Sequence, residues 1–348
     1  MILHQSTVEQ VIDGNERERF VKEICVVRGR CSKGTEIPLA MVRKRAVGAS
    51  STRASVLLIH GYGQNRYAWH LPSRSFSCYL ARAGFDVFNL DLRGHGRSKH
   101  LGARRPHDVS EFVSQDVPWA LSEIEQLTGR RGVFLVGHSL GGLVSYAAAT
   151  QAEGSVSGIV TIGSPYHFTR GSLPLTMAGH VLLAVDRRMS FGHGSLGLRA
   201  FGESMRLMRV FVESPVFPLP IRGFLPGSMD PLVLSQHMAL AMDNGSITVL
   251  RNMFLAAAEA RRSGHRLGGL SGFAEEFEAM NVPLLVIAGK NDDLAPPASV
   301  EPGYESSRAR DKTYRVFPQG HIDLVMGNDA TKTIWPLVEL WIGARAKR

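Results

Sequence analysis

Cysteine, acidic side chains and long apolar runs are all scarce in this sequence of 348 residues. The 3 cysteines (Cys25, Cys31 and Cys78) are too few for a disulfide framework, and their spacing does not match a zinc site. No apolar run approaches the roughly 18 residues that cross a membrane. The first residues lack the basic-then-apolar order of a signal peptide. We therefore expect a cytoplasmic protein with a hydrophobic core and no metal site.

Basic side chains outnumber acidic ones, 40 to 31, which leaves a net charge of +9. Such an excess can serve the binding of nucleic acid or of anionic membranes. Here the basic residues are scattered in short clusters such as Arg130-Arg131, without a basic helix or a nucleic-acid-binding motif. We expect no nucleic-acid partner and at most a weak association with lipid interfaces. The pattern carries no signal for an oligomeric state.

Residues 132–149 read as a buried strand followed directly by a buried helix. The run Val133–Val136 is continuously apolar, as in a strand that is covered on both faces of a parallel sheet. The run Leu140–Ala149 is small, apolar and rich in helix formers. The pentapeptide Gly137–Gly141 joins the two, so the sequence predicts a sharp strand-to-helix turn there.

That turn carries the candidate nucleophile. Glycine at 137 and 141 removes side chains that would collide in so sharp a turn, which leaves the hydroxyl of Ser139 exposed at the end of the sheet. His138 lies inside the same turn, and the N–H of Leu140 starts the helix, where it can donate to an oxyanion. The alternative is a glycine-rich turn with a surface serine, which the strand before it and the helix after it argue against.

Buried strands and helices also alternate along the rest of the chain. The predicted strands are residues 20–27, 36–43, 55–60, 85–91, 158–163, 283–289 and 312–317, and the predicted helices are residues 73–83, 110–127, 298–308 and 331–344. The second helix is expected to begin at an N-cap, Ser110, and to break near Pro118. Residues 1–20 are polar and are predicted to form a loose arm. The alternation indicates an α/β protein with a mostly parallel, doubly wound sheet.

Between Tyr166 and Phe277 this alternation stops. The segment is rich in Met, Leu, Phe, Pro and Gly, with helical patterns at 198–212, 232–242 and 249–263. A structureless loop of this length is implausible, so we predict a helical cap at 166–277 between core segments 1–165 and 278–348. Its flexible and aromatic side chains would suit an apolar acyl chain, although ordinary packing explains any single one of them equally well.

A serine becomes a nucleophile only when a base removes its proton and an acid orients that base. His321 follows the last predicted strand, and Asp292 and Asp293 follow the strand before it. The carboxyl ends of parallel strands meet at one edge of the sheet, so Ser139 and these residues are expected to converge. We favour Asp292 over Asp293 as the acid. Such a mechanism needs no metal and no organic cofactor.

The second oxyanion donor is expected in the loop after the strand at residues 55–60. Gly61 and Gly63 allow a tight turn that would direct the N–H of Tyr62 toward the serine. An ordinary glycine-rich turn, with the Tyr62 side chain only shielding the site, is the alternative.

Several motifs together resemble the α/β-hydrolase superfamily, of the serine esterase and lipase type: His60-Gly-Tyr-Gly63, Asp91-Leu-Arg-Gly-His-Gly-Arg-Ser98, Gly137-His-Ser-Leu-Gly141, Asp292 and Gly320-His321. The resemblance covers about residues 55–165 and 280–345. A finer likeness, to the acid lipases and the polyhydroxyalkanoate-synthase-like hydrolases, rests on residues 76–88, 115–119 and 321–330. The resemblance implies an α/β-hydrolase fold, here with the cap inserted after the sixth strand, and catalysis through a covalent acyl-enzyme.

The expected activity is hydrolysis of a small-molecule ester with an apolar acyl or alkyl group. Polyester synthases carry cysteine at the nucleophile, and Ser139 therefore favours hydrolysis over polymerisation. An acyltransferase or a polyester depolymerase on the same fold is the first alternative. A non-catalytic binding protein is the second, and it is disfavoured because all three triad positions are filled.

Overall fold

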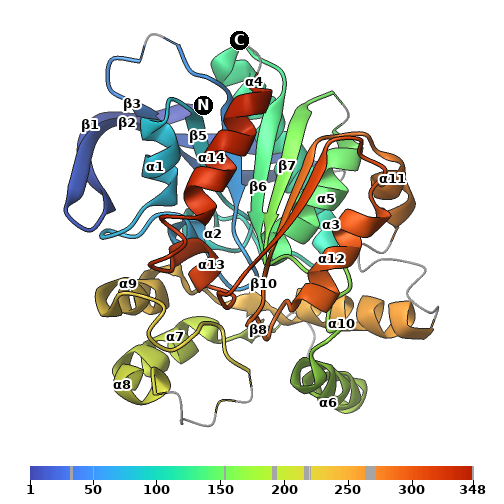
Figure 1. Cartoon of the computed structure of the whole chain (residues 1–348). Coiled ribbons are helices and arrows are strands. Elements are labelled where there is room, and N and C mark those ends of the chain that lie inside the picture. Colours follow the sequence, from blue (N-terminus) through green and yellow to red (C-terminus); the bar gives the residue numbers. More distant parts are fainter. Residues whose placement is uncertain are drawn as a thin grey trace.

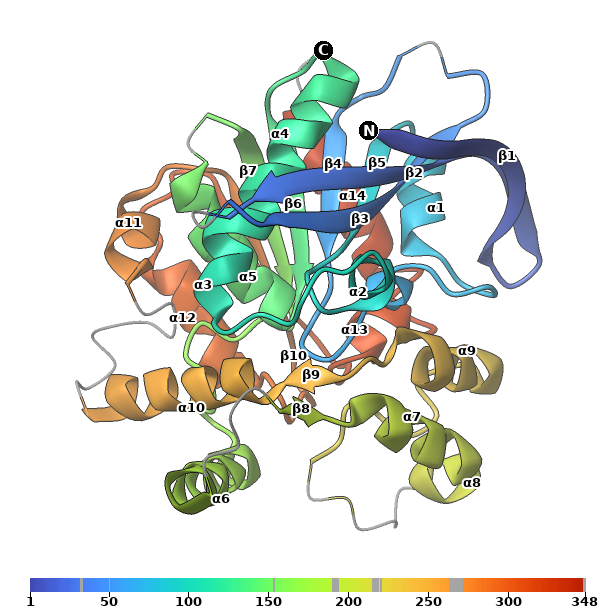
Figure 2. The same cartoon turned by 180° about the vertical axis from the view of Figure 1, so that it is seen from behind.

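The computed structural model describes residues 1–31, 34–49, 51–152, 154–189, 194–214, 219, 221–262 and 272–346. Within these residues the strands are β1 (Ile2–Asp13), β2 (Glu16–Arg30), β3 (Glu36–Ala46), β4 (Ser55–Ile59), β5 (Asp86–Asp91), β6 (Val133–His138), β7 (Val156–Ile162), β8 (Ser195–Leu196), β9 (Gly245–Ser246), β10 (Leu284–Gly289) and β11 (Lys312–Phe317). β8 and β9 pair with each other, and the rest form one sheet in the order β1-β2-β3-β5-β4-β6-β7-β10-β11 (Figures 1 and 2). The pairs β1–β2, β2–β3 and β3–β5 are antiparallel. The remaining pairs, from β5 through β4, β6, β7 and β10 to β11, are parallel.

Helices cover both faces of this sheet, which confirms the predicted doubly wound architecture. Those of the core are α1 (Phe76–Arg82), α2 (Gly96–His100), α3 (Val109–Glu111), α4 (Val117–Thr128), α5 (Leu140–Gln151), α12 (Pro297–Ser306), α13 (Asp323–Met326) and α14 (Ile334–Arg345), with a 3₁₀ turn at Arg66–Ala68 and a π-helical turn at Phe112–Asp116. Strands β4, β5, β6 and β10 are buried at every position, because they lie in the middle of the sheet with helices on either side. One apolar layer lies under α1 and α14, and the other under α4, α5 and α12.

The prediction of a loose N-terminal arm is wrong. Residues Ile2–Asp13 form β1, which pairs antiparallel with β2 along most of its length at the edge of the sheet. Half of its residues are exposed, including the consecutive residues 2–5, whose side chains point to both faces, so the alternation that marks a half-buried strand is missing from the sequence. Its backbone ladder to β2 and the buried Ile12 hold it in place. Because of this extra strand, the cap segment follows the seventh strand, β7, and not the sixth as predicted.

The predicted start of the helix near residue 110 is also displaced. The N-cap is Asp108, whose carboxylate accepts a hydrogen bond from the N–H of Ser110 at 2.7 Å. Aspartate is as good an N-cap as serine, and the helix therefore begins two residues earlier than predicted. The predicted break near Pro118 is present, since a π-helical turn precedes α4 and Pro118 lies in the first turn of that helix.

The chain between β7 and β10 mostly gathers at one end of the sheet, whereas its last helix, at Ala274–Ala279, lies beside α5 (Figures 1 and 2). It contains α6 (Leu173–Met189), α7 (Leu198–Leu207), α8 (Arg209–Val212), α9 (Pro231–Gln236), a π-helical turn (His237–Ala241), α10 (Ile247–Arg262) and α11 (Ala274–Ala279). The helical patterns at 198–212, 232–242 and 249–263 correspond to α7 to α10, with residue 263 outside the described residues. α6 and α11 were not predicted. No helix in the described part of the chain is long and apolar enough to span a bilayer.

Candidate active site

Ser139 lies in a strained turn between β6 and α5. Its φ of 54° and ψ of −124° are unusual for a residue other than glycine. A Cβ atom at Gly137 would lie 2.4 Å from the backbone of Gly141, and one at Gly141 would lie 2.1 Å from the carbonyl oxygen of Ile59. Both glycines are therefore required for the close approach of α5 to β4 and β6, as the sequence predicts.

His321 and Asp292 meet at the carboxyl ends of β11 and β10. His321 Nδ1 lies 2.7 Å from Asp292 Oδ2, and the two residues are only 4% and 2% exposed. The other carboxylate oxygen, Oδ1, accepts hydrogen bonds from the N–H groups of Leu294 at 2.9 Å and Ala295 at 2.7 Å. The carboxylate is thus held by backbone donors on one side and faces the imidazole on the other.

Asp293, the competing acid, points elsewhere. Its side chain is exposed, and its Oδ2 accepts a hydrogen bond from the backbone N–H of Arg222 at 3.0 Å. The geometry therefore favours Asp292 as the partner of His321.

Gly163, at the end of β7, is part of the site but was not recognised in the sequence. Its φ is +55°, and a Cβ there would lie 3.1 Å from Asp292 Oδ2 and 3.3 Å from His321 Nδ1. A side chain at this position would push into the acid–base pair. The only signal in the sequence is a glycine at the carboxyl end of a predicted strand.

His138 supports the backbone of His321. It is buried, its Nε2 donates to the carbonyl oxygen of His321 at 3.1 Å, and the two ring centroids are 4.6 Å apart. Burial lowers the pKa of His138 well below its usual range, and the neighbouring His321 lowers it further. His138 is therefore neutral near pH 7. It can hold the backbone of His321 in place without placing a second positive charge beside that imidazole.

The loop after β4 presents the peptide bond between Gly61 and Tyr62 beside the serine. A Cβ at Gly61 would lie 3.0 Å from Ser139 Cβ. His60 Nε2 accepts from the N–H of Leu92 at 3.1 Å, so its Nδ1 carries the proton and donates to the carbonyl oxygen of Gly61 at 2.9 Å. Because the N–H and C=O of a trans peptide point in opposite directions, this bond directs the Tyr62 N–H away from His60.

Neither proposed oxyanion donor is already occupied. Leu140 is the first residue of α5, where an N–H has no acceptor within the helix. Among the hydrogen bonds of the described residues, none uses the N–H of Tyr62 or of Leu140. Both groups are therefore available to a ligand.

The loop after β4 is held from outside by the segment 241–246, which leads from the π-helical turn at His237–Ala241 into α10. The N–H of Asp243 donates to the carbonyl oxygen of Gly63 at 2.7 Å, and the Tyr62 hydroxyl donates to the carbonyl oxygen of Ser246 at 2.9 Å. Gly63 has a φ of +61°, and a Cβ there would lie 2.2 Å from the Leu198 side chain of α7 and 3.3 Å from the carbonyl oxygen of Asp243. These contacts between the loop after β4 and the segment 241–246 join residues far apart in the chain and were not predicted.

The side chain of Asp243 anchors that segment to the core. Its carboxylate is nearly buried and accepts hydrogen bonds from Gly96 N at 2.7 Å, Asn244 N at 2.8 Å and Lys99 Nζ at 2.9 Å. Burial alone would raise the pKa of this carboxyl, but the bond from Lys99 and the two backbone bonds outweigh burial and lower it. Asp243 is therefore ionised at neutral pH.

Ser139 and His321 line a cavity of about 570 Å³ that is otherwise mostly apolar. Its walls include Leu175 and Leu182 of α6, Phe201 and Met205 of α7, Met238, and Phe254 of α10. No hydrogen bond joins Ser139 to His321 in the described part of the chain, and such contacts often tighten only when substrate binds. Among these residues, no group of three or more His, Cys, Asp or Glu is arranged to hold a metal ion.

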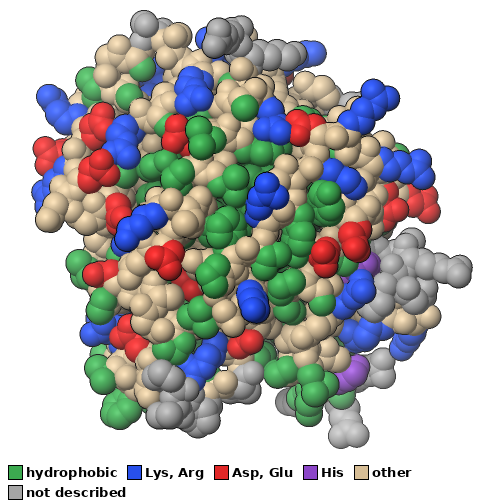
Figure 3. Space-filling view, viewed as in Figure 1, with side chains coloured by type: hydrophobic (Ala, Val, Ile, Leu, Met, Phe, Trp, Pro, Cys, Tyr) green, Lys and Arg blue, Asp and Glu red, His purple; other side chains and the backbone are tan. Residues whose placement is uncertain are grey.

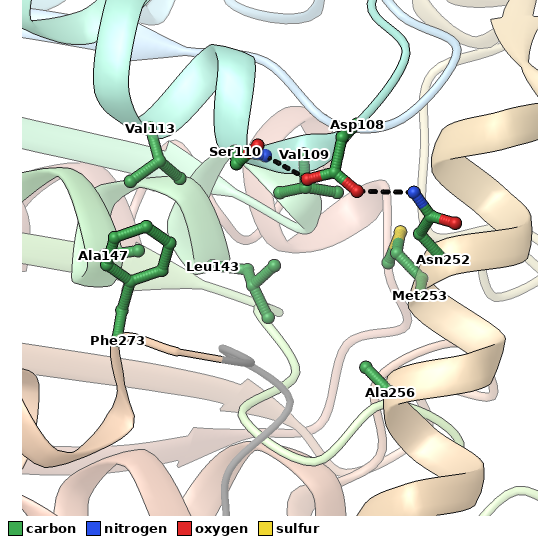
Figure 4. Close-up of a pocket in the computed structure, with 10 residues that line it drawn as sticks. All are labelled: Asp108, Val109, Ser110, Val113, Leu143, Ala147, Asn252, Met253, Ala256 and Phe273. Carbon is green, nitrogen blue, oxygen red and sulfur yellow. Dashed lines mark hydrogen bonds between the residues drawn. The ribbon is translucent and has the colours of Figure 1, made fainter.

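A smaller cavity of about 60 Å³ lies between α3, α5 and α10 (Figure 4). Asp108 spans its polar side, accepting hydrogen bonds from Ser110 N and Asn252 Nδ2, and Leu143 and Phe273 line its apolar side. A water molecule takes up roughly 30 Å³, so this space can hold about two waters and no substrate.

Comparison with known proteins supports the predicted fold and enzyme class. A model of the α/β hydrolase fold matches residues 54–208. A monoacylglycerol lipase of Mycolicibacterium smegmatis is 27% identical over 292 residues, which are 83% of this chain and 88% of that protein. This chain has the α/β-hydrolase fold. The hydrolase is also 28% identical over 207 residues to a pimeloyl-[acyl-carrier protein] methyl ester esterase of Sodalis glossinidius, covering 56% of this chain and 72% of that one.

Solved structures agree on the fold. A monoacylglycerol lipase of Paleococcus ferrophilus superposes with a TM-score of 0.60 at 20% identity, covering 88% of the hydrolase and 99% of that chain. An esterase of Thermogutta terrifontis gives 0.59 at 18% identity, covering 93% and 99%. The predicted α/β-hydrolase fold is thus confirmed. The predicted class, a carboxylic ester hydrolase of the esterase and lipase type, is confirmed as well by the two sequence relatives.

Proposed function

We propose that the hydrolase cleaves esters with apolar acyl or alkyl groups through an acyl-enzyme on Ser139. His321 takes the proton of the Ser139 hydroxyl as Oγ attacks the ester carbonyl, and Asp292 orients and stabilises the imidazolium. The N–H groups of Tyr62 and Leu140 stabilise the oxyanion, each contributing about 3–4 kcal/mol at the transition state.

The tetrahedral intermediate then loses the alcohol to give the acyl-enzyme, which water hydrolyses in a second step. The carbon–oxygen bond to the leaving alcohol breaks, and the alcohol takes the proton held by His321. Water next gives its proton to His321 and its oxygen to the acyl carbon, which releases the acid and returns the proton to Ser139. The observation that carries this proposal is the buried Asp292–His321 pair at 2.7 Å, in the same apolar cavity as a strained serine.

The segment 166–277 is proposed as a cap domain between core segments 1–165 and 278–348. Its helices α6, α7 and α10 supply a large part of the apolar wall of the cavity. No Asp, Glu, Lys or Arg is among the residues that line the cavity. An uncharged acyl or alkyl group fits such a wall better than an ionised one, because burying an unpaired charge costs several kcal/mol or more. We propose that the cap selects apolar esters on this basis.

Hydrolysis of p-nitrophenyl esters from acetate to palmitate tests the activity and the chain length together. We expect turnover with an optimum at a chain length set by the cavity, and a loss of about a million-fold in kcat for Ser139→Ala. Ser204→Ala, which removes an exposed hydroxyl from α7, is the matched control and should keep wild-type rates. Turnover that survives in Ser139→Ala would refute the proposed nucleophile. Transfer to an added alcohol in preference to water would indicate an acyltransferase.

A further inference from the structure

A second cleft lies at the end of the sheet opposite Ser139. It has a volume of about 630 Å³ and is formed by residues 51–55, 130–132 and 345–346, together with Gly84, Phe134 and Ser157. The first two segments lead into the amino ends of β4 and β6, whereas Ser139 follows the carboxyl end of β6. In Figure 1 this end of the molecule lies near the C-terminus and away from the cap helices.

The lining of this cleft is basic and rich in hydroxyl groups. It contains four arginines, Arg53, Arg130, Arg131 and Arg345, and four hydroxyl side chains, Ser51, Thr52, Ser55 and Ser157. No carboxylate is among the lining residues. Elsewhere on the face drawn in Figure 3, basic side chains are spread out and often lie beside acidic ones. Guanidinium and hydroxyl donors that converge without a lining carboxylate suit a phosphate group.

Two of the arginines are held in place by contacts that do not use up their donors. Arg130 donates from one terminal nitrogen to the carbonyl oxygen of Thr52 at 2.6 Å. Arg53 donates to the carbonyl oxygen of Ala83 at 3.2 Å, and its guanidinium lies 4.7 Å from the centre of the Phe85 ring. It also lies 3.6 Å from a carboxylate oxygen of Glu339, which is outside the lining. A guanidinium has five N–H donors, so each arginine keeps several for a ligand. Arg130 makes no ion pair with any described residue.

Arg345 is fixed in a similar way at the far side of the cleft. It donates to the carbonyl oxygen of Trp341 at 2.9 Å, stacks at 4.1 Å over that ring, and pairs with Asp311. Arg131 pairs with Glu125 at 2.7 Å on the open surface. Asp311 and Glu125 lie outside the lining. The exposed Arg131–Glu125 pair is weak, whereas Asp311 accepts two hydrogen bonds from Arg345. The attraction of the cleft for a dianion therefore comes mainly from Arg53, Arg130 and Arg131.

We propose that this cleft binds a phosphate-bearing anion, of the size of a diphosphate or a small phosphate ester. Ester hydrolysis in an apolar cavity makes no use of these arginines, and the cleft gives the Arg130-Arg131 cluster a function. The phosphate group can belong to a soluble metabolite or to a lipid head group. Both would be recognised by the same donors.

Isothermal titration of the full chain with sodium pyrophosphate tests the site. We expect saturable binding that weakens as NaCl rises, because the attraction is ionic. The double variant Arg53→Gln/Arg130→Gln should bind about tenfold more weakly or worse, since it loses charge-assisted hydrogen bonds. Arg199→Gln/Arg206→Gln, which removes the same charge from exposed positions on α7, should bind like the wild type.

The source of the phosphate is separated by a vesicle arm. Sedimentation with phosphatidic acid vesicles that depends on Arg53 and Arg130, without pyrophosphate binding, assigns the cleft to a lipid head group. Pyrophosphate binding without vesicle binding assigns it to a soluble ligand. All measurements are repeated in Ser139→Ala, so the result is independent of ester hydrolysis. Absence of both kinds of binding, or equal affinities in the wild type and both double variants, would overturn the proposal.

Discussion

Replacing Asp243 by asparagine should slow catalysis from a position outside the proposed triad. The carboxylate accepts three hydrogen bonds, from Gly96, Lys99 and Asn244, while the N–H of the same residue holds the carbonyl oxygen of Gly63. Asparagine keeps the shape of the side chain, but its NH₂ group must face one of these donors. The anchor is therefore weakened, and the loop that presents the Tyr62 N–H loses part of its support.

The size of the effect follows from the donors involved. A hydrogen bond to a charged group is worth about 1.5–3 kcal/mol, and one oxyanion donor is worth about 10²–10³ in kcat. Asp243→Asn displaces the donor without deleting it, so we expect kcat to fall about 10- to 100-fold. The apolar walls that bind the acyl chain are unchanged, and KM should stay within about twofold.

Steady-state kinetics on the best p-nitrophenyl ester measures both constants. Asp230→Asn is the matched control, because Asp230 is the N-cap of α9 in the same cap segment and asparagine caps a helix equally well. It removes the same charge and should keep the wild-type kcat. Thermal unfolding establishes that both variants are folded at the assay temperature. A wild-type kcat in Asp243→Asn, or a rise in KM alone, would refute the reasoning.

Three further predictions follow from named contacts. Asp292→Asn should lower kcat about 10⁴-fold because His321 loses its orienting acceptor, whereas Asp293→Asn should change it less than about twofold; equal losses in kinetic assays would contradict the assignment. Gly163→Ala should destabilise the fold by about 1–2 kcal/mol in urea unfolding and lower kcat, because its Cβ meets the acid–base pair at a positive φ. Burial lowers the pKa of Lys44 from 10.5 to about 8, so the unfolded chain binds more protons between these values and stability rises with pH there. The rise, up to about 3 kcal/mol, should be absent from urea unfolding of Lys44→Met; a rise of the same size in that variant would exclude Lys44 as its source.

The nucleophile turn could be predicted because its determinants are local. A buried strand, two glycines that leave room for a crossing backbone and a helix of small residues all lie within residues 132–149. The pairing of Asp292 with His321 could be predicted because parallel strands place their carboxyl ends together. The choice between Asp292 and Asp293 needed the structure, since only the direction of each side chain distinguishes them.

Three other features of the structure were not predictable from the sequence. β1 has exposed side chains on both faces, so only its backbone pairing with β2 marks it as a strand. The contact of Gly163 with the acid–base pair joins residues from three strand ends. The hydrogen bond from the Asp243 N–H to the carbonyl oxygen of Gly63 joins the segment 241–246 to the loop after β4. The composition of neither segment predicts this contact.

Covalent labelling of Ser139 tests the proposed mechanism most directly. A p-nitrophenyl alkylphosphonate transfers its phosphonyl group to an activated serine and releases p-nitrophenol, so intact mass and colour report the same event. We expect one group per chain, located on the peptide that contains Ser139, with slow labelling in Asp292→Asn and none in Ser139→Ala. A label on another residue, or equal labelling of the Ser139→Ala variant, would contradict the proposed nucleophile.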